Sequence, residues 1–202
     1  LTRRTSLKLI CSFISIFTLP KNAISKKSIR RYELIAKKGQ HTFDNRVMSN
    51  LSLFNKVNPG PTISGIKGEI LEVLFKNELD EPSSIHWHGI RNLNKMDGVP
   101  GLTQKLVYPG ESFLYKFPIN NAGSFWYHTH HKSWKQNAQG LHGVLIVKDD
   151  DSELNERDII LVVDDWRLDK NNQIHSKSFG SLHDWSHGGR IGNYLTINGK
   201  SI

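Results

Sequence analysis

The chain has 202 residues, enough for one or two domains that each bury a hydrophobic core. Its formal net charge of +8 arises in the first 40 residues, which hold ten of the 27 Lys and Arg and one of the 19 acids. Residues 41–202 therefore carry 17 basic and 18 acidic residues. This balance does not indicate a phosphate-binding face, and nucleic acid is not an expected partner.

The basic N-terminal segment, residues 1–25, has its charged, apolar and breaker residues in the order of a secretory signal. Residues 1–25, LTRRTSLKLICSFISIFTLPKNAIS, pass from a positive start through an apolar run at about residues 7–19 to Pro20. The run is shorter than the roughly 20 residues of a spanning helix, so we expect export and no stable membrane span. TRRTSLK resembles a twin-arginine signal with Ser6 where Phe is usual, which predicts a periplasmic protein. An uncleaved anchor or a chance Arg pair is the alternative.

Cysteine is confined to this segment. Cys11 is the only cysteine of the chain, so removal of the signal would leave none. A disulfide, a zinc ribbon and a thiol nucleophile are then excluded. Any bound metal would have to use His and carboxylate ligands.

Past residue 28 the chain alternates short strand-like runs with turn clusters such as NPGPTISG and MDGVPG. Runs rich in β-branched and aromatic residues predict strands at 69–77, 112–119, 143–149 and 158–166. No sustained run of apolar residues shows helical spacing. Many short strands without helices favour an all-β sandwich with Greek-key connections.

A change of composition divides this β region. The hydrophilic connector KDDDSELNER, residues 148–157, predicts a domain boundary. We therefore expect one domain at 29–149 and the start of a second at 156–202. The second is expected to be truncated, because it stops before it can close a sheet.

Two histidine pairs stand out in the first of these domains. SSIHWHGIRN contains His86 and His88, and GSFWYHTHHK contains His128 and His130. Residues two apart on a strand share a face, so each pair projects on one side, with Trp126 on the side of the second pair. Four imidazoles from neighbouring strands can converge on one volume. Imidazole suits Cu, Zn, Ni and Fe, and the ligand type alone does not choose among them.

A single histidine on a strand is most often an ordinary surface or core residue. Two H-x-H motifs within 45 residues, each beside aromatic residues, favour a metal site instead. His131 falls on the opposite face and is expected to bind solvent or a hydrogen-bond partner, whereas His142 is a packing residue or a partner of a ligand. The remaining histidines have no partner spacing and are predicted to be non-ligands: His41, His175, His183 and His187.

The motifs together resemble the first cupredoxin domain of the multicopper oxidases, the family of laccases and bacterial copper-tolerance oxidases. The resemblance rests on H-W-H-G, MDGVPG, YPGESFLYKF, W-Y-H-x-H and GLHGVLIV, and extends from about residue 29 to residue 199. It implies a cupredoxin-like Greek-key sandwich and copper as the metal. By the family pattern, His86 would bind type 2 copper, and three residues would bind the type 3 pair: His88, His128 and His130.

The resemblance also implies a reaction. The family reduces O2 to water with electrons from a small donor, such as a cuprous or other metal ion or a phenol-like compound. Asp97, in KMDGVPG, matches an acid that relays protons in bacterial members, although Asp before Gly98 is equally typical of a turn.

Part of the family's machinery is not in this sequence. The type 1 copper that accepts electrons needs a Cys thiolate, which the mature chain would lack, and the remaining cluster ligands lie in a C-terminal cupredoxin domain. We therefore expect the N-terminal portion of an oxidase, inactive alone, whose partners are the missing domains. Two alternatives remain: a non-catalytic exported cupredoxin protein of the division-related scaffold type, and a copper-binding carrier.

Overall fold

The computed structural model describes residues 28–44, 47–149, 158–182 and 189–202. The predicted signal at 1–25 and Cys11 lie outside these residues, as do His183, His187 and most of the predicted boundary at 148–157. No helix in the described ranges is long and apolar enough to cross a membrane.

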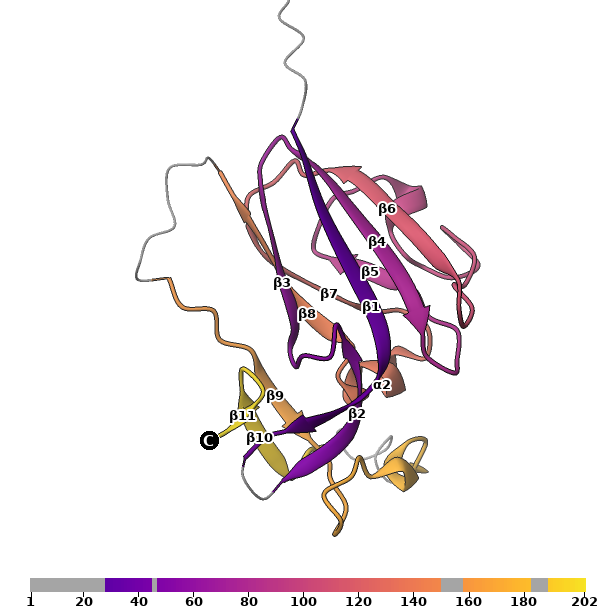
Figure 1. Cartoon of the computed structure of the whole chain (residues 1–202), viewed down its shortest axis with the longest axis vertical. Helices are drawn as coiled ribbons and strands as arrows, with labels where there is room; N and C mark the ends of the chain where they lie inside the picture. Colours follow the sequence, from indigo (N-terminus) through magenta and orange to yellow (C-terminus); the bar gives the residue numbers. More distant parts are fainter. Residues whose placement is uncertain (1–27, 45–46, 150–157, 183–188) are drawn as a thin grey trace, which may run out of the picture.

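Two four-stranded sheets face each other across a hydrophobic core (Figure 1). The first has the order β2 (Met48–Phe54), β1 (Ile29–Thr42), β4 (Ile70–Glu78), β6 (Ser112–Pro118). The second has the order β3 (Gly60–Ile66), β8 (His142–Lys148), β7 (Gly123–Thr129), β5 (Ile85–His88). Strands β1 and β4 pair in parallel, as do β3 and β8, so the chain crosses repeatedly between sheets. This arrangement confirms the predicted all-β sandwich.

Three predicted strands lie within one residue of β4, β6 and β8, but the prediction for 158–166 is too long. Strand β9 covers only Val163–Trp166. The preceding residues are held by the side chain of Asn198, which accepts from Val162 N at 2.8 Å and donates to Ile160 O at 2.9 Å. The side chain of one Asn thus bonds to backbone groups that a strand ladder would use, and residues 158–162 are irregular.

Strand β1 is the longest element, and its composition hides it from sequence patterns. Its sequence IRRYELIAKKGQHT is rich in charge, which is uncommon in strands. Ion pairs with β4 and the residues next to it offset this unfavourable composition, since opposite charges on paired strands stabilise a sheet. Those pairs are Arg30–Glu69, Arg31–Glu72, Glu33–Lys76, Lys37–Glu78 and Lys38–Asp80.

Trp87 lies at the centre of the sandwich core. Its side chain is fully buried, and its ring centroid lies 5.5 Å from Tyr115, 5.3 Å from Phe117 and 5.9 Å from Tyr127. These rings come from β6 and β7, one strand in each sheet. Because alternate residues of a strand point to opposite faces, burying Trp87 turns His86 and His88 out of the core.

A third, smaller sheet packs beside the sandwich (Figure 1). It has the order β11 (Lys200–Ser201), β10 (Tyr194–Ile197), β9. Trp166 of β9 and Phe43, which follows β1, lie 5.1 Å apart by ring centroid and share a second buried cluster with Leu51 and Leu53 of β2. Short helices within the described ranges include η1 (Asn94–Met96), α2 (Ser133–Gln136), η2 (Asn137–Gln139) and η3 (Ser176–Ser178).

Candidate metal centre

Strands β5 and β7 bring the two histidine pairs together. They are antiparallel neighbours in which His86 lies opposite His128 and His88 lies opposite Trp126. The nitrogen atoms available as ligands in three histidines lie within 4.8 Å of one another: His86, His88 and His128. Neighbouring strands at one edge of the sandwich thus build a compact imidazole cluster.

His130 lies beside this cluster, one residue past the end of β7. Its ring centroid is 5.4 Å from that of His86 and 6.3 Å from that of His128. Its backbone N–H donates to Ser84 O at 3.2 Å, which holds it against the start of β5. All four predicted ligands are therefore neighbours, although the closest group contains only three.

His86 is held by the turn that contains Asp97. Its Nδ1 lies 2.7 Å from Asp97 O and 3.4 Å from Asp97 Oδ1. A carbonyl oxygen can only accept a hydrogen bond, so the Nδ1–H of His86 donates and Nε2 keeps a free lone pair. Asp97 thus contacts the cluster through its backbone, with its carboxylate close by.

Gly98 explains why this turn can lie so close to β5. It has φ of +82°, and a Cβ at this position would overlap the carbonyl of Ile85. Its own carbonyl accepts from Ser84 Oγ at 2.8 Å. Only glycine combines this backbone conformation with this approach, so the MDG sequence fixes where Asp97 meets His86.

His128 is the most deeply buried of the four histidines. Burial lowers its pKa to about 4, and the neighbouring imidazoles of His86 and His88 act in the same direction. Its Nε2 is buried and has no hydrogen-bond partner in the described structure. A buried polar nitrogen without a partner is costly unless something else binds it, and a metal ion would satisfy it.

Trp126 covers one side of the cluster. Its ring stacks on His128 with centroids 4.1 Å apart, and it lies 5.0 Å from His88. The sequence places Trp126 on the same face as His128, and the stacking agrees with that placement. The ring restricts how both histidines can turn, which preorganises the site.

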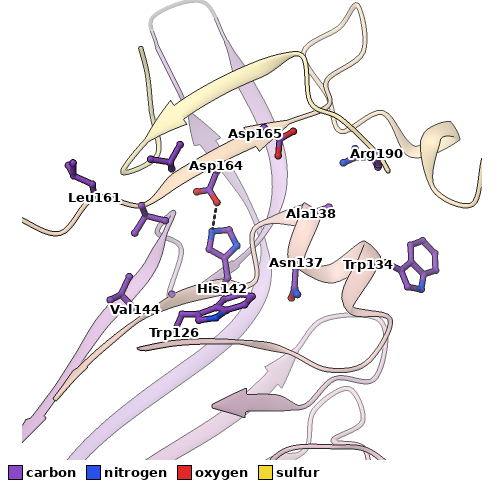
Figure 2. Close-up of a pocket in the computed structure, with 13 residues that line it drawn as sticks. Trp126, Trp134, Asn137, Ala138, His142, Val144, Leu161, Asp164, Asp165 and Arg190 are labelled. Atoms are coloured by element: carbon purple, nitrogen blue, oxygen red, sulfur yellow. Dashed lines mark ion pairs between the residues drawn. The ribbon is translucent and has the colours of Figure 1, made fainter. Parts of the chain in front are cut away.

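Other histidines serve other contacts. His142 extends into a cavity of about 590 Å³ between β8 and β9, where its Nε2 lies 3.1 Å from Asp164 Oδ1 (Figure 2). His41 Nε2 lies 2.7 Å from Gly199 O, which links β1 to the third sheet. Sequence spacing gave no sign of the Asp164 contact, because that residue comes from another sheet.

Two amide side chains also lie beside the cluster, and no sequence pattern predicts them there. Gln136 is fully buried and bonds to the segment before β5, while Asn137 reaches His128. No motif or spacing rule marks either residue. A polar residue in the turn after W-Y-H-x-H is the only signal that the sequence offers.

Comparison with known proteins decides the family. Residues 35–152, more than half of the chain, match the multicopper oxidase family. This chain belongs to that family. Membership supports copper as the metal, and the imidazole cluster suits copper.

Laccases and copper resistance proteins are among the curated relatives of this multicopper oxidase chain. Laccase-1 of Cryptococcus neoformans var. grubii is 38% identical over 128 residues, covering 59% of this chain and 20% of the relative. A copper resistance protein A homolog of Pseudomonas syringae pv. tomato is 37% identical over 110 residues, covering 54% and 18%. The chain thus spans about a fifth of the length of these relatives.

Solved structures of the family agree with the fold. A multi-copper oxidase from Pseudomonas thermotolerans has a TM-score of 0.81 at 33% identity, covering 87% of this chain and 42% of that one. A multicopper oxidase from Campylobacter jejuni, described as a metallo-oxidase, has a TM-score of 0.73 at 32% identity, covering 90% and 38%. The cupredoxin-like sandwich predicted from the sequence is therefore confirmed.

Proposed function

We propose that this chain supplies half of the His ligands of a trinuclear copper cluster in an exported multicopper oxidase. That enzyme would couple one-electron oxidation of a small reducing substrate to four-electron reduction of O2 to water. The observation that carries the proposal is the convergence of three imidazoles, with the buried Nε2 of His128 left free for a metal. The substrate would be a cuprous or other metal ion, or a phenol-like donor.

The four histidines would have different roles. By the family pattern, His86 is the type 2 ligand, and His88, His128 and His130 are type 3 ligands. The separate position of His86 supports this division, since it alone of the four bonds to the Asp97 turn through Nδ1. Copper ions held there would take up electrons one at a time and pass them to O2, three from the cluster itself and the fourth from the type 1 copper, as reduction of O2 to water requires.

The residues around the cluster would orient ligands and move protons. Asp97 O fixes the Nδ1–H of His86, and a carboxylate 3.4 Å from the same nitrogen is placed to hold a proton beside the site. With 31% of its side chain exposed, Asp97 can also exchange that proton with solvent. Trp126 would exclude water from the side on which it stacks.

Electron entry would depend on other domains. A type 1 copper needs a Cys ligand, and Cys11 in the predicted signal is the only cysteine of these 202 residues. We propose that C-terminal cupredoxin domains provide the type 1 site and the remaining histidines, and that the chain alone does not turn over. Export to the periplasm through the twin-arginine pathway is part of the same proposal.

Copper titration of the purified chain tests the function. We expect copper binding without the intense blue absorption of a type 1 centre. His128→Asn should weaken binding by at least about tenfold, since it removes a buried ligand. His41→Asn is the matched control, because His41 lies outside the cluster, and it should bind like the wild type.

Three results would count against the proposal. Equal loss in His128→Asn and His41→Asn would show that copper binds elsewhere. Binding that stays intact in His128→Asn, and also when the four histidines are replaced together, would leave no role for the cluster. A chain that binds copper and also reduces O2 unaided would contradict the dependence on further domains.

A further inference from the structure

The side chain of Asn137 lies next to His128. It begins η2 directly after α2, and its side chain lies at the margin of the cavity that contains Trp126 and His142 (Figure 2). It is half-buried, and its amide reaches back to β7.

The preceding residue fixes where Asn137 lies. The Gln136 side chain is fully buried, its Oε1 accepts from Ser83 Oγ at 2.9 Å, and its Nε2 donates to Pro82 O at 2.9 Å. Pro82 and Ser83 lead directly into β5, which carries His86 and His88. The short helical segment is therefore tied to both histidine strands, and Asn137 has little freedom to move away from the cluster.

Three groups meet at the Nδ1 side of His128. Nδ1 lies 2.9 Å from Thr129 O and 3.3 Å from Asn137 Nδ2, while Thr129 Oγ1 lies 3.0 Å from Asn137 Oδ1. Thr129 O can only accept, so Nδ1 must carry a proton to bond with it. An amide NH2 cannot donate to a nitrogen that already carries a proton.

A half-turn of the Asn137 amide about its Cβ–Cγ bond removes this conflict at Nδ1. Oδ1 then faces Nδ1–H and accepts from it, while Nδ2 donates to Thr129 Oγ1, which has free lone pairs. The opposite orientation suits only the other tautomer of His128, in which Nε2 carries the proton. Each orientation of this one amide therefore matches one tautomer of the ring.

We propose that Asn137 is a positioning residue that holds His128 in the Nδ1–H tautomer, so that the buried Nε2 presents a lone pair to the cluster. The amide oxygen and Thr129 O share the Nδ1 proton, and the anchored helix keeps the amide in place. The consequence for copper rests on the proposed function, whereas the tautomer is a property of the chain itself.

Nitrogen NMR of the metal-free chain measures the tautomer directly. In a 15N-labelled sample at a pH where His128 is neutral, two-bond 1H–15N spectra distinguish a protonated ring nitrogen from a bare one. We expect His128 in the wild type to show a protonated Nδ1 and a bare Nε2. A bare Nδ1 in the wild type would overturn the proposal without any variant.

Variants separate the role of the amide from that of Thr129. Asn137→Leu removes the acceptor, so the His128 shifts should move towards those of a mixture of tautomers. Asn137→Asp keeps an acceptor and should retain the wild-type tautomer. Gln139→Leu makes the same amide-to-leucine change in η2, where the side chain lines a different cavity, and should also retain it. An unchanged tautomer in Asn137→Leu would overturn the proposal, because Thr129 O would then suffice.

Cuprous ion affinity, measured by competition with a chromophoric chelator, provides the second readout. Asn137→Leu should lower the affinity about 10- to 100-fold, as is usual when a partner of a ligating His is lost, and Asn137→Asp should stay near the wild type. If the wild type binds no copper but Asn137→Leu still loses the tautomer, the proposed function fails and the role of Asn137 stands. If both proteins bind copper, equal affinities in the wild type and Asn137→Leu would overturn that role.

Discussion

Two buried tryptophans among the described residues are held in different ways. Trp87 is packed among aromatic rings of both sheets of the sandwich, and its Nε1 has no hydrogen-bond partner among the described residues. Trp166, 2% exposed, packs on Phe43 and donates from Nε1 to Thr196 Oγ1 at 2.9 Å. One is fixed by shape alone, and the other by shape together with one directed bond.

The two regions therefore depend on different interactions for their structure. Around Trp87, ring packing fixes β5, and the pleat then aims the flanking histidines at the candidate copper site. Around Trp166, the hydrogen bond sets how β9 and β10 meet while Phe43 attaches the third sheet to the sandwich. Damage at Trp87 should therefore affect both stability and metal binding, whereas damage at Trp166 should affect stability alone.

Trp87→Ala should have the largest effect. Removing a fully buried Trp from an aromatic core costs about 3–5 kcal/mol of unfolding free energy, because the cavity only partly collapses. Copper affinity should fall as well, since β5 loses its anchor. Denaturant unfolding and copper titration measure the two effects. Trp87→Phe is the milder control and should keep more of the unfolding free energy and of the copper affinity. If Trp87→Ala unfolds like the wild type, ring packing does not fix β5.

Gly98→Ala should come next and act on the same region. A Cβ at φ of +82° and against the Ile85 carbonyl requires the turn to move, at a cost of about 2–3 kcal/mol. Because Asp97 O holds the His86 ring, copper affinity should fall too. Gly101→Ala is the matched control, because it also has positive φ but an open space around it. Equal effects of both substitutions would show that strain alone, and not the approach to β5, matters.

Thr196→Val probes the other tryptophan. It keeps the shape of the buried side chain but leaves Trp166 Nε1 without its acceptor, so it should cost about 1–2 kcal/mol of unfolding free energy. Copper affinity should be unchanged, because the third sheet contributes no histidine to the cluster. A copper affinity that falls with Thr196→Val would remove the distinction between the two regions.

Glu69→Gln should have the smallest effect and should depend on pH. The Arg30 guanidinium, with Ser28 and the Ile66 amide, lowers the pKa of Glu69 to about 2. Since the unfolded chain takes up this proton near the ordinary pKa of 4.5, the stabilisation is complete above that pH and is lost as pH falls towards 2.

Urea unfolding between pH 2 and 6 tests the Glu69 prediction. The wild type should lose stability across that window more steeply than Glu69→Gln. Glu33→Gln, at an exposed ion pair with Lys76, is the control and should follow the wild type. Parallel curves for the wild type and Glu69→Gln would contradict the predicted contribution.

The parts of the fold that sequence patterns predicted share one physical basis. Strands β4, β6 and β8 alternate buried and more exposed residues, so the period of two is visible in the residue types. Strand β1 could not be found in this way, because its charged residues are stabilised by ion pairs with β4, about 40 residues away in sequence. The sequence predicts too long a strand at β9, because the hydrogen bond from the Val162 N–H to the Asn198 side chain has no local signal.

The sequence by itself determined the all-β class and the pairing of His86 with His88 and of His128 with His130. It did so because side chains two residues apart on a strand point to the same face of the sheet. Only the tertiary structure decided which strands are neighbours, how Gly98 brings Asp97 to His86, and how Asn137 meets His128. Those contacts join residues on different strands and turns, and their distances are set by packing of the whole sandwich, which no local pattern of residues contains.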